Sequence, residues 1–171
     1  MGGVFRRGLR ASLLLVLVVN ALPGMLAAQA AAFNPFGSGC RGPAGTPQMA
    51  VVQNSLPVIG KQFQLSVTGL PNAVYNTVFG VVGLSKTQWK ATKLPLDLTS
   101  MGITGCSMYV SPDYMEEIPK VGSTATWTMR VPNQAGIVGR TVYLQTWVID
   151  GHANPGAVLV SNAGEAKLGS R

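Results

Sequence analysis

Hydrophobic and polar residues alternate along several stretches of the chain, and a period of two is typical of half-buried β-strands. The clearest stretch is 124–131, whose inward face would carry Ala125, Trp127, Met129 and Val131. The same alternation predicts strands at 62–68 and 106–111. In the second of these strands, Cys106 points toward the core.

Two further stretches, 77–83 and 141–149, are apolar on both faces, which is typical of central strands covered from both sides. Shorter strands are expected at 49–53, 157–161 and 166–169. Runs rich in glycine, proline and asparagine separate the stretches and predict turns. Seven or eight short strands without helical crossovers predict an all-β fold, an antiparallel sandwich of two sheets.

Residues 85–104 break the alternation and predict a long connection that crosses between the sheets. We expect Leu94, Leu96 and Leu98 to be tucked beneath it, and the connection has room for a short helical turn.

The N-terminal segment has the pattern of an export signal. Three arginines precede an apolar run at 13–19, and Ala28-Gln29-Ala30 forms a small-x-small cleavage pattern. Retention as a membrane anchor is the alternative, but Asn20 and Pro23 interrupt the apolar stretch that a span requires. We therefore predict a signal peptide at 1–30 that is cleaved near Ala30, and no stable membrane span afterwards.

The rest of the chain divides into an extended N-terminal arm at 31–45 and a β-sandwich domain at 46–171. The predicted location is secreted, periplasmic or at the cell surface. Since such compartments are oxidising, we expect Cys40 and Cys106 to form a disulfide that ties the arm to the core, and two unpaired buried thiols are the alternative.

Charge argues against a nucleic-acid partner. The sequence has 13 Lys and Arg against 6 Asp and Glu, and without the three signal arginines ten cations face six acids, a net charge of +4. The cations are scattered, and the densest group is Lys86, Lys90 and Lys93. Nucleic-acid binding usually needs a concentrated stripe, so a solvated loop is expected here, with contact to an anionic polymer or membrane surface as the alternative.

The chain offers little catalytic chemistry. Its one histidine, His152, lies in a loop-like run at 150–156 without a Gly-x-Ser-x-Gly motif, and Glu116 and Glu117 would point apart on a strand. Oxygen ligands for calcium could come from loops, but no Asp-x-Asp-x-Asp run is present and ordinary turn capping explains these residues. Those residues are Asp97, Asp113, Asp150 and Asn154. We predict no catalytic residue, no cofactor, no metal and no enzyme activity.

Aromatic residues suggest one ligand contact. Trp89 lies in the irregular connection beside Lys86 and Lys90, where an exposed ring could stack on a sugar or dock a partner, although it could equally cover the edge of the sandwich. Trp127 and Trp147 fall in strand patterns and are expected in the core.

Several short motifs together resemble a secreted all-β module that is found in many exported bacterial proteins. They are Gly39-Cys40, 57–60, 69–71, 94–98, 102–106, Trp127, 131–133, Gly139, Gln145, Asp150 and Ser161-Asn162. The resemblance covers about 39–169 and implies the fold, an exported bacterial origin and a cysteine pair at these places, without an established activity. The lysine-bearing segment 85–90 departs from the usual pattern, so ligand preference does not carry over.

We therefore expect a non-enzymatic secreted or cell-surface β-sandwich with a structural or adhesion role. The alternative is a module that binds carbohydrate or a cell-envelope polymer. Its partner would be such a polymer or another secreted protein.

Overall fold

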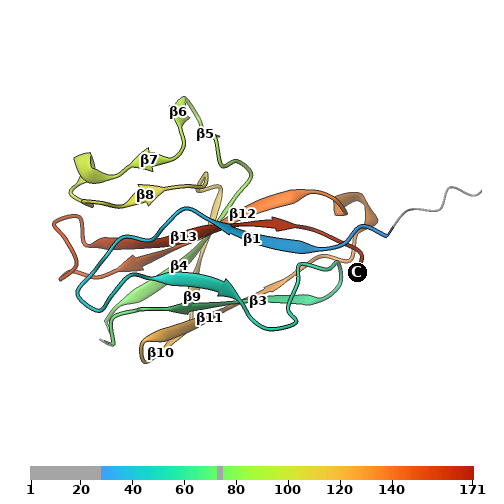
Figure 1. Ribbon diagram of the computed structural model, residues 1–171, viewed down its shortest axis with the longest axis horizontal. Coiled ribbons are helices and arrows are strands. Elements are labelled where there is room, and N and C mark those ends of the chain that lie inside the picture. The colour runs from blue at the N-terminus through green and yellow to red at the C-terminus, as the bar shows by residue number, and fades with distance from the viewer. Residues whose placement is uncertain (1–27, 73–74) are drawn as a thin grey trace, which may run out of the picture.

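The fold is all-β, as predicted. The computed structural model describes residues 28–72 and 75–171, so most of the predicted signal peptide lies outside the described residues. Two antiparallel sheets of five and four strands pack face to face (Figure 1). The two-sheet sandwich is confirmed, with nine strands in its two main sheets where the sequence predicted seven or eight.

The chain passes between the two sheets several times, so strands that are distant in sequence become neighbours. The larger sheet contains, in order, β1 (Ala32–Phe36), β13 (Val158–Lys167), β12 (Thr141–Ile149), β4 (Thr77–Gly83) and β9 (Tyr114–Ile118). The smaller sheet contains, in order, β10 (Lys120–Val121), β11 (Thr124–Arg130), β3 (Gln62–Thr68) and β2 (Gln48–Val51).

A small third layer covers part of the outer face of the larger sheet. It contains the hairpin β5–β6, the pair β7–β8 and a 3-10 helix, η1; a second short helix, η2, precedes β12. Their bounds are Gln88–Trp89, Thr92–Lys93, Leu96–Asp97, Ser107–Met108, Thr99–Met101 and Ala135–Ile137. The predicted connection at 85–104, with its short helical turn, is thus part of this layer. Leu94 and Leu98 are buried beneath it and Leu96 is half-buried. The predicted crossing between the sheets is wrong, because the segment leads from β4 to β9, which pair in the larger sheet.

Gln145 shows how the third layer is held on the sheet. This side chain of β12 is fully buried, accepts a hydrogen bond from Tyr109 N (3.0 Å) and donates to Ser107 O (3.0 Å) and Ser161 O (3.0 Å). Next to it, Val81, Val110 and Ala163 form a small apolar cluster. Both faces of the central strands are therefore buried, which explains why 77–83 and 141–149 are apolar on both sides.

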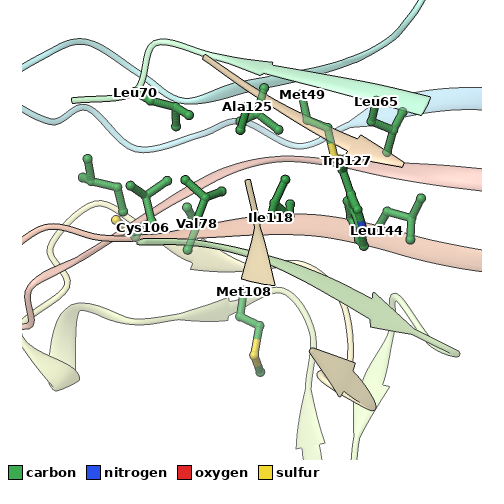
Figure 2. Packing of buried hydrophobic residues seen from close by; sticks show 14 of the residues in the cluster. Met49, Leu65, Leu70, Val78, Cys106, Met108, Ile118, Ala125, Trp127 and Leu144 are labelled. Carbon is green, nitrogen blue, oxygen red and sulfur yellow. The ribbon is translucent and has the colours of Figure 1, made fainter. Parts of the chain in front are cut away.

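The main core lies between the two sheets (Figure 2). Trp127 reaches from β11 toward the larger sheet, packs against Gly80 of β4 and donates a hydrogen bond from Nε1 to Glu116 Oε1 (2.6 Å). A Cβ atom at Gly80 would lie 2.4 Å from the indole ring. Glycine is therefore required at this position because the ring occupies the space of any larger side chain.

The stretch expected as an arm, 31–45, contains a strand of the larger sheet. Strand β1 pairs with β13 along its whole length, from Ala32 opposite Lys167 to Phe36 opposite Ala163. At the other edge, the sequence analysis missed β9, because Tyr114, Met115 and Glu117 are all exposed and give no alternation.

Two other strands differ in length from the prediction. The stretch 106–111 forms only the short strand β8, because Tyr109 and Val110 contact side chains of the larger sheet instead of extending the strand. The two short strands expected at 157–161 and 166–169 merge into the ten-residue strand β13, because the intervening segment stays paired with β1 and β12.

The predicted disulfide is present. Cys40 and Cys106 are both buried, their Cα atoms are 4.8 Å apart, and the bond joins the loop after β1 to the third layer. Among the described residues, no helix is long and apolar enough to cross a membrane.

Removing the disulfide should destabilise the fold. The bond closes a loop of 66 residues, so the double variant C40A/C106A should lose about 4 kcal/mol of unfolding free energy in urea denaturation. Mass analysis of the unreduced protein should find no free thiol. Two free thiols, or a double variant as stable as the parent, would contradict this prediction.

Replacing Gly80 should also be costly. Because the added methyl group would meet the Trp127 ring, Gly80→Ala should lower the unfolding free energy by roughly 1–3 kcal/mol. Gly136→Ala is the matched control, since a Cβ atom there meets nothing within 4 Å, and its effect should stay within about 0.5 kcal/mol. Equal losses in the two variants would show that the ring and Gly80 are not in tight contact.

Candidate functional site

Two of the three predicted ligand residues lie together at the tip of the β5–β6 hairpin. Lys90 has a left-handed backbone (φ 52°) in the turn, and its Nζ atom lies 5.0 Å from the centre of the Trp89 ring. Trp89 is half-buried and packs against the main core. Its ring therefore covers the core on one side and is in contact with Lys90 on another.

The third residue, Lys86, belongs to a different cluster. Its Nζ atom pairs with Glu165 Oε2 of β13 (2.5 Å) and lies 5.4 Å and 5.5 Å from the ring centres of Phe36 and Tyr143. The hydrogen bond with Glu165 raises the pKa of Lys86 above its ordinary value. Lys86 is thus engaged on the face of the larger sheet.

A second group of polar side chains gathers at the end of the sandwich where β4 begins and β12 ends. We call this the loop end. Arg140 lies at the other end of β12. Asp150 directly follows β12 and is buried, and its Oδ1 atom accepts a hydrogen bond from His152 N (3.0 Å). A carboxylate that accepts from the backbone two residues later forms an Asx turn. His152 therefore lies in a turn, as its sequence context predicts.

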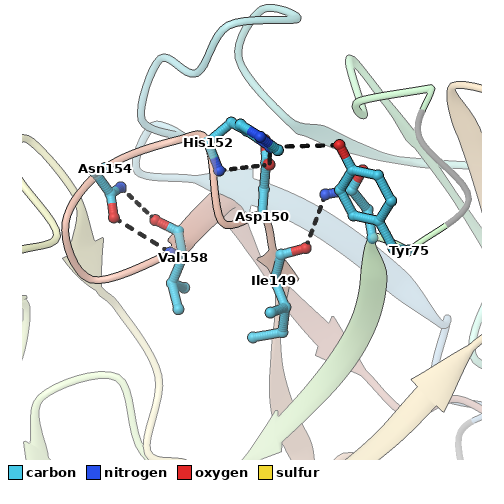
Figure 3. Close-up of polar contacts among 7 residues, drawn as sticks. Tyr75, Ile149, Asp150, His152, Asn154 and Val158 are labelled. Carbon is cyan, nitrogen blue, oxygen red and sulfur yellow. Dashed lines mark hydrogen bonds and ion pairs between the residues drawn. The ribbon is translucent and has the colours of Figure 1, made fainter.

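The His152 ring lies against Tyr75 (Figure 3). Tyr75 Oη lies 3.4 Å from His152 Nδ1, and the two ring centres are 5.9 Å apart. The same Nδ1 atom is 3.7 Å from Asp150 Oδ1. Both rings are largely open to solvent, with 73% of the His152 side chain and 64% of Tyr75 exposed.

Two asparagines hold the base of this group in place. Asn154 donates to Val158 O (2.6 Å) and accepts from Val158 N (3.2 Å), which closes the loop after β12. Asn76 donates to Ile149 O (3.0 Å), whereas its own buried Oδ1 atom has no partner among the described residues. These contacts fix the positions of Asp150 and Tyr75 relative to the strand ends (Figure 3).

These residues border a hollow of about 340 Å³, which we call the loop-end hollow. Its lining consists of Pro43, Ala44, Pro71, Asn72, Tyr75, Asn76, Asp150 and His152. A neighbouring hollow of about 270 Å³ shares Asn72 and Asn76 with it and extends toward Glu117 and Lys120. Lys120 binds the carbonyl oxygens of Pro71 (2.7 Å) and Gly122 (2.8 Å), which joins the two loops between the hollows.

The loop-end hollow is suited to holding a polar ligand. Its lining supplies amide, imidazole, carboxylate and phenol groups, and the exposed ring of Tyr75 adds an apolar face. Among those lining residues the Tyr75 phenol is the single hydroxyl group, and Asp150 is the single carboxylate. In the described part of the chain, no three residues of the types His, Cys, Asp and Glu come together as metal ligands.

Sequence reasoning did not bring Tyr75 and His152 together, since 77 residues separate them. The pairing of β4 with β12 would have indicated this contact. Tyr75 precedes β4 and His152 follows β12, and these strands pair antiparallel with Thr77 opposite Ile149. The loops at that end must therefore meet.

No protein-family model, curated protein or solved structure matches this chain. The resemblance to an exported bacterial module thus remains a prediction in its origin and location, while its all-β fold and single disulfide are confirmed.

The ion pair of Lys86 can be tested by titration. We expect nuclear magnetic resonance to show a raised pKa for the Lys86 amine, and Glu165→Gln should lower that pKa. A raised pKa contributes stability below the ordinary lysine pKa, and this contribution is lost as pH rises through the raised value. A Lys86 pKa that is unchanged by Glu165→Gln would show that the pair does not form in solution.

Proposed function

We propose that this chain is a non-enzymatic β-sandwich protein of the cell exterior, with a structural or adhesion role. The observation that carries this proposal is the use of its carboxylates. Five of the six bind structural donors of the fold: Asp97 binds Thr99 N, Asp113 binds Leu84 N and Ser111 Oγ, Glu116 binds Trp127 Nε1, Asp150 binds His152 N, and Glu165 binds Lys86 Nζ. Carboxylates held in this way stabilise loops and strands, so a structural role accounts for their positions.

The buried disulfide supports a location outside the reducing cytoplasm. Disulfides persist in secreted, periplasmic and cell-surface proteins. The Cys40–Cys106 bond links two separate parts of the fold, as expected for a structural bond. An exported bacterial protein, as the sequence resemblance implies, is consistent with this bond.

Binding of carbohydrate or a cell-envelope polymer is a second function that a specific observation favours. At the loop-end hollow, the exposed Tyr75 ring stands beside His152, Asn72 and the buried Asp150. A sugar has apolar C–H faces and many hydroxyl groups, so an aromatic ring with nearby amide and carboxylate groups is complementary to it. Under this second proposal the ligand would contact Tyr75, in addition to the predicted contact at Trp89 and Lys90.

A glycan array tests the second function. If the loop-end hollow binds sugars, Tyr75→Ala should weaken binding at least tenfold, which corresponds to losing about 1.4 kcal/mol of contact. Tyr114→Ala is the matched control, because Tyr114 is similarly exposed (58%) but lies on β9. Trp89→Ala tests the contact that the sequence suggested.

The outcomes separate the alternatives. Loss in Tyr75→Ala with unchanged binding in Tyr114→Ala would support the loop-end hollow, and loss in Trp89→Ala alone would move the contact to the β5–β6 hairpin. Absence of binding to every glycan and to purified envelope polymers would remove the binding function. The structural or adhesion role would then be tested by deleting the gene for this protein and measuring the integrity of the cell surface and the attachment of the cells.

A further inference from the structure

Four cations that are far apart in the sequence lie at one end of the sandwich. Lys61 directly precedes β3, Arg130 ends β11, Arg140 directly precedes β12, and Lys167 ends β13. Strand pairing brings them together in twos, because Gln62 lies opposite Arg130 and Thr141 lies opposite Lys167. We call this the basic end; it is the end where β3 and β12 begin.

A hollow between the sheets confirms that the pairs β3–β11 and β12–β13 lie at the same end of the sandwich. It has a volume of about 150 Å³ and combines residues of the smaller sheet with residues of the larger one. Arg130 lines it together with Phe63 and Met129, and Val142 and Leu168 close it from the other sheet. Apart from Arg130 its side chains are apolar, and a cavity of this size can hold a group as large as a benzene ring.

The charges of the basic end are available to a partner. Lys61, Arg130, Arg140 and Lys167 are all exposed. Within the described residues, none of the four forms an ion pair, and Glu165, the carboxylate nearest to Lys167 in sequence, is paired with Lys86. Four cations at one end of the sandwich, of which Arg130 borders the apolar hollow, produce a positive field that attracts anionic groups.

The chain also enters the fold at this end. Gln29 O accepts from Ser170 N (2.9 Å), and Ala31 N donates to Arg171 O (2.9 Å), so residues 28–31 lie beside the end of β13 (Figure 1). The first described residues of the chain therefore lie at the basic end.

We propose that the basic end docks on an anionic membrane surface, with lipid phosphates at the four cations and the apolar hollow open to an acyl chain or another apolar group of the lipid. Anionic lipids attract clusters of Lys and Arg, and the attraction grows with each cation. Docking in this way would turn the loop end, with its hollow at Tyr75 and His152, away from the membrane. The inference is independent of whether the loop-end hollow binds sugars.

Vesicle co-sedimentation of the purified exported protein tests the proposal. The protein should bind vesicles of phosphatidylcholine with phosphatidylglycerol, should bind pure phosphatidylcholine far less, and should be released by added salt. The double variant R130Q/R140Q should weaken binding by roughly 25-fold, about fivefold for each cation. The control K90Q/K93Q removes the same charge from the β5–β6 hairpin and should change binding by less than about twofold.

Three results would overturn the proposal. They are absence of binding to both the anionic vesicles and a soluble polyanion such as heparin, equal losses in R130Q/R140Q and K90Q/K93Q, and binding to heparin without binding to vesicles. The first two would show that this end has no special affinity for lipid, and the third would assign it to an anionic polymer. Because all four substituted residues are exposed, circular dichroism and an intact disulfide should confirm that both variants fold.

Discussion

The outer face of the larger sheet carries apolar side chains that must be kept from water, and the segment 84–111 is laid over it for this purpose. Val81 and Ala163 on the sheet meet Val110 of the covering segment. A buried polar side chain is tolerated there because Gln145 has all its partners, from Tyr109, Ser107 and Ser161. The rest of the fold depends on this cover, since without it β12 and β13 would expose an apolar surface.

The disulfide acts on the same feature. The third layer consists mostly of two-residue strands, which have few backbone hydrogen bonds of their own. Cys106 lies in this layer, and Cys40 is joined to β13 by the hydrogen bond from its N atom to Val160 O (3.1 Å). The covalent bond therefore ties the layer to the sheet that it covers, which explains why an oxidising compartment suits this fold.

The sequence predicted the strands that have a strong local pattern. The bounds of β3, β4 and β12 agree with the expected stretches, because each has alternating or continuous apolar residues between turn residues. Strand β9 was missed because an edge strand can be exposed on both faces. Strand β1 was missed because it is stabilised by backbone pairing with β13 rather than by burial of its side chains. Such pairing joins residues more than 120 positions apart and leaves no local pattern.

The same reasoning explains why the position of charge could not be predicted. Lys86, Lys90 and Lys93 are close in sequence, yet Lys86 turns to Glu165 and Lys90 lies on Trp89. Lys61, Arg130, Arg140 and Lys167 form no group in the sequence, and strand topology brings them to one end.

Strand β12 separates that end from the loop end. It has nine residues, and at about 3.4 Å for each residue it holds Arg140 and Asp150 roughly 30 Å apart. This distance exceeds the screening length of about 8 Å at physiological salt. The cations at one end therefore act on a partner independently of the polar hollow at the other, and a rigid sandwich can contact two different surfaces at once.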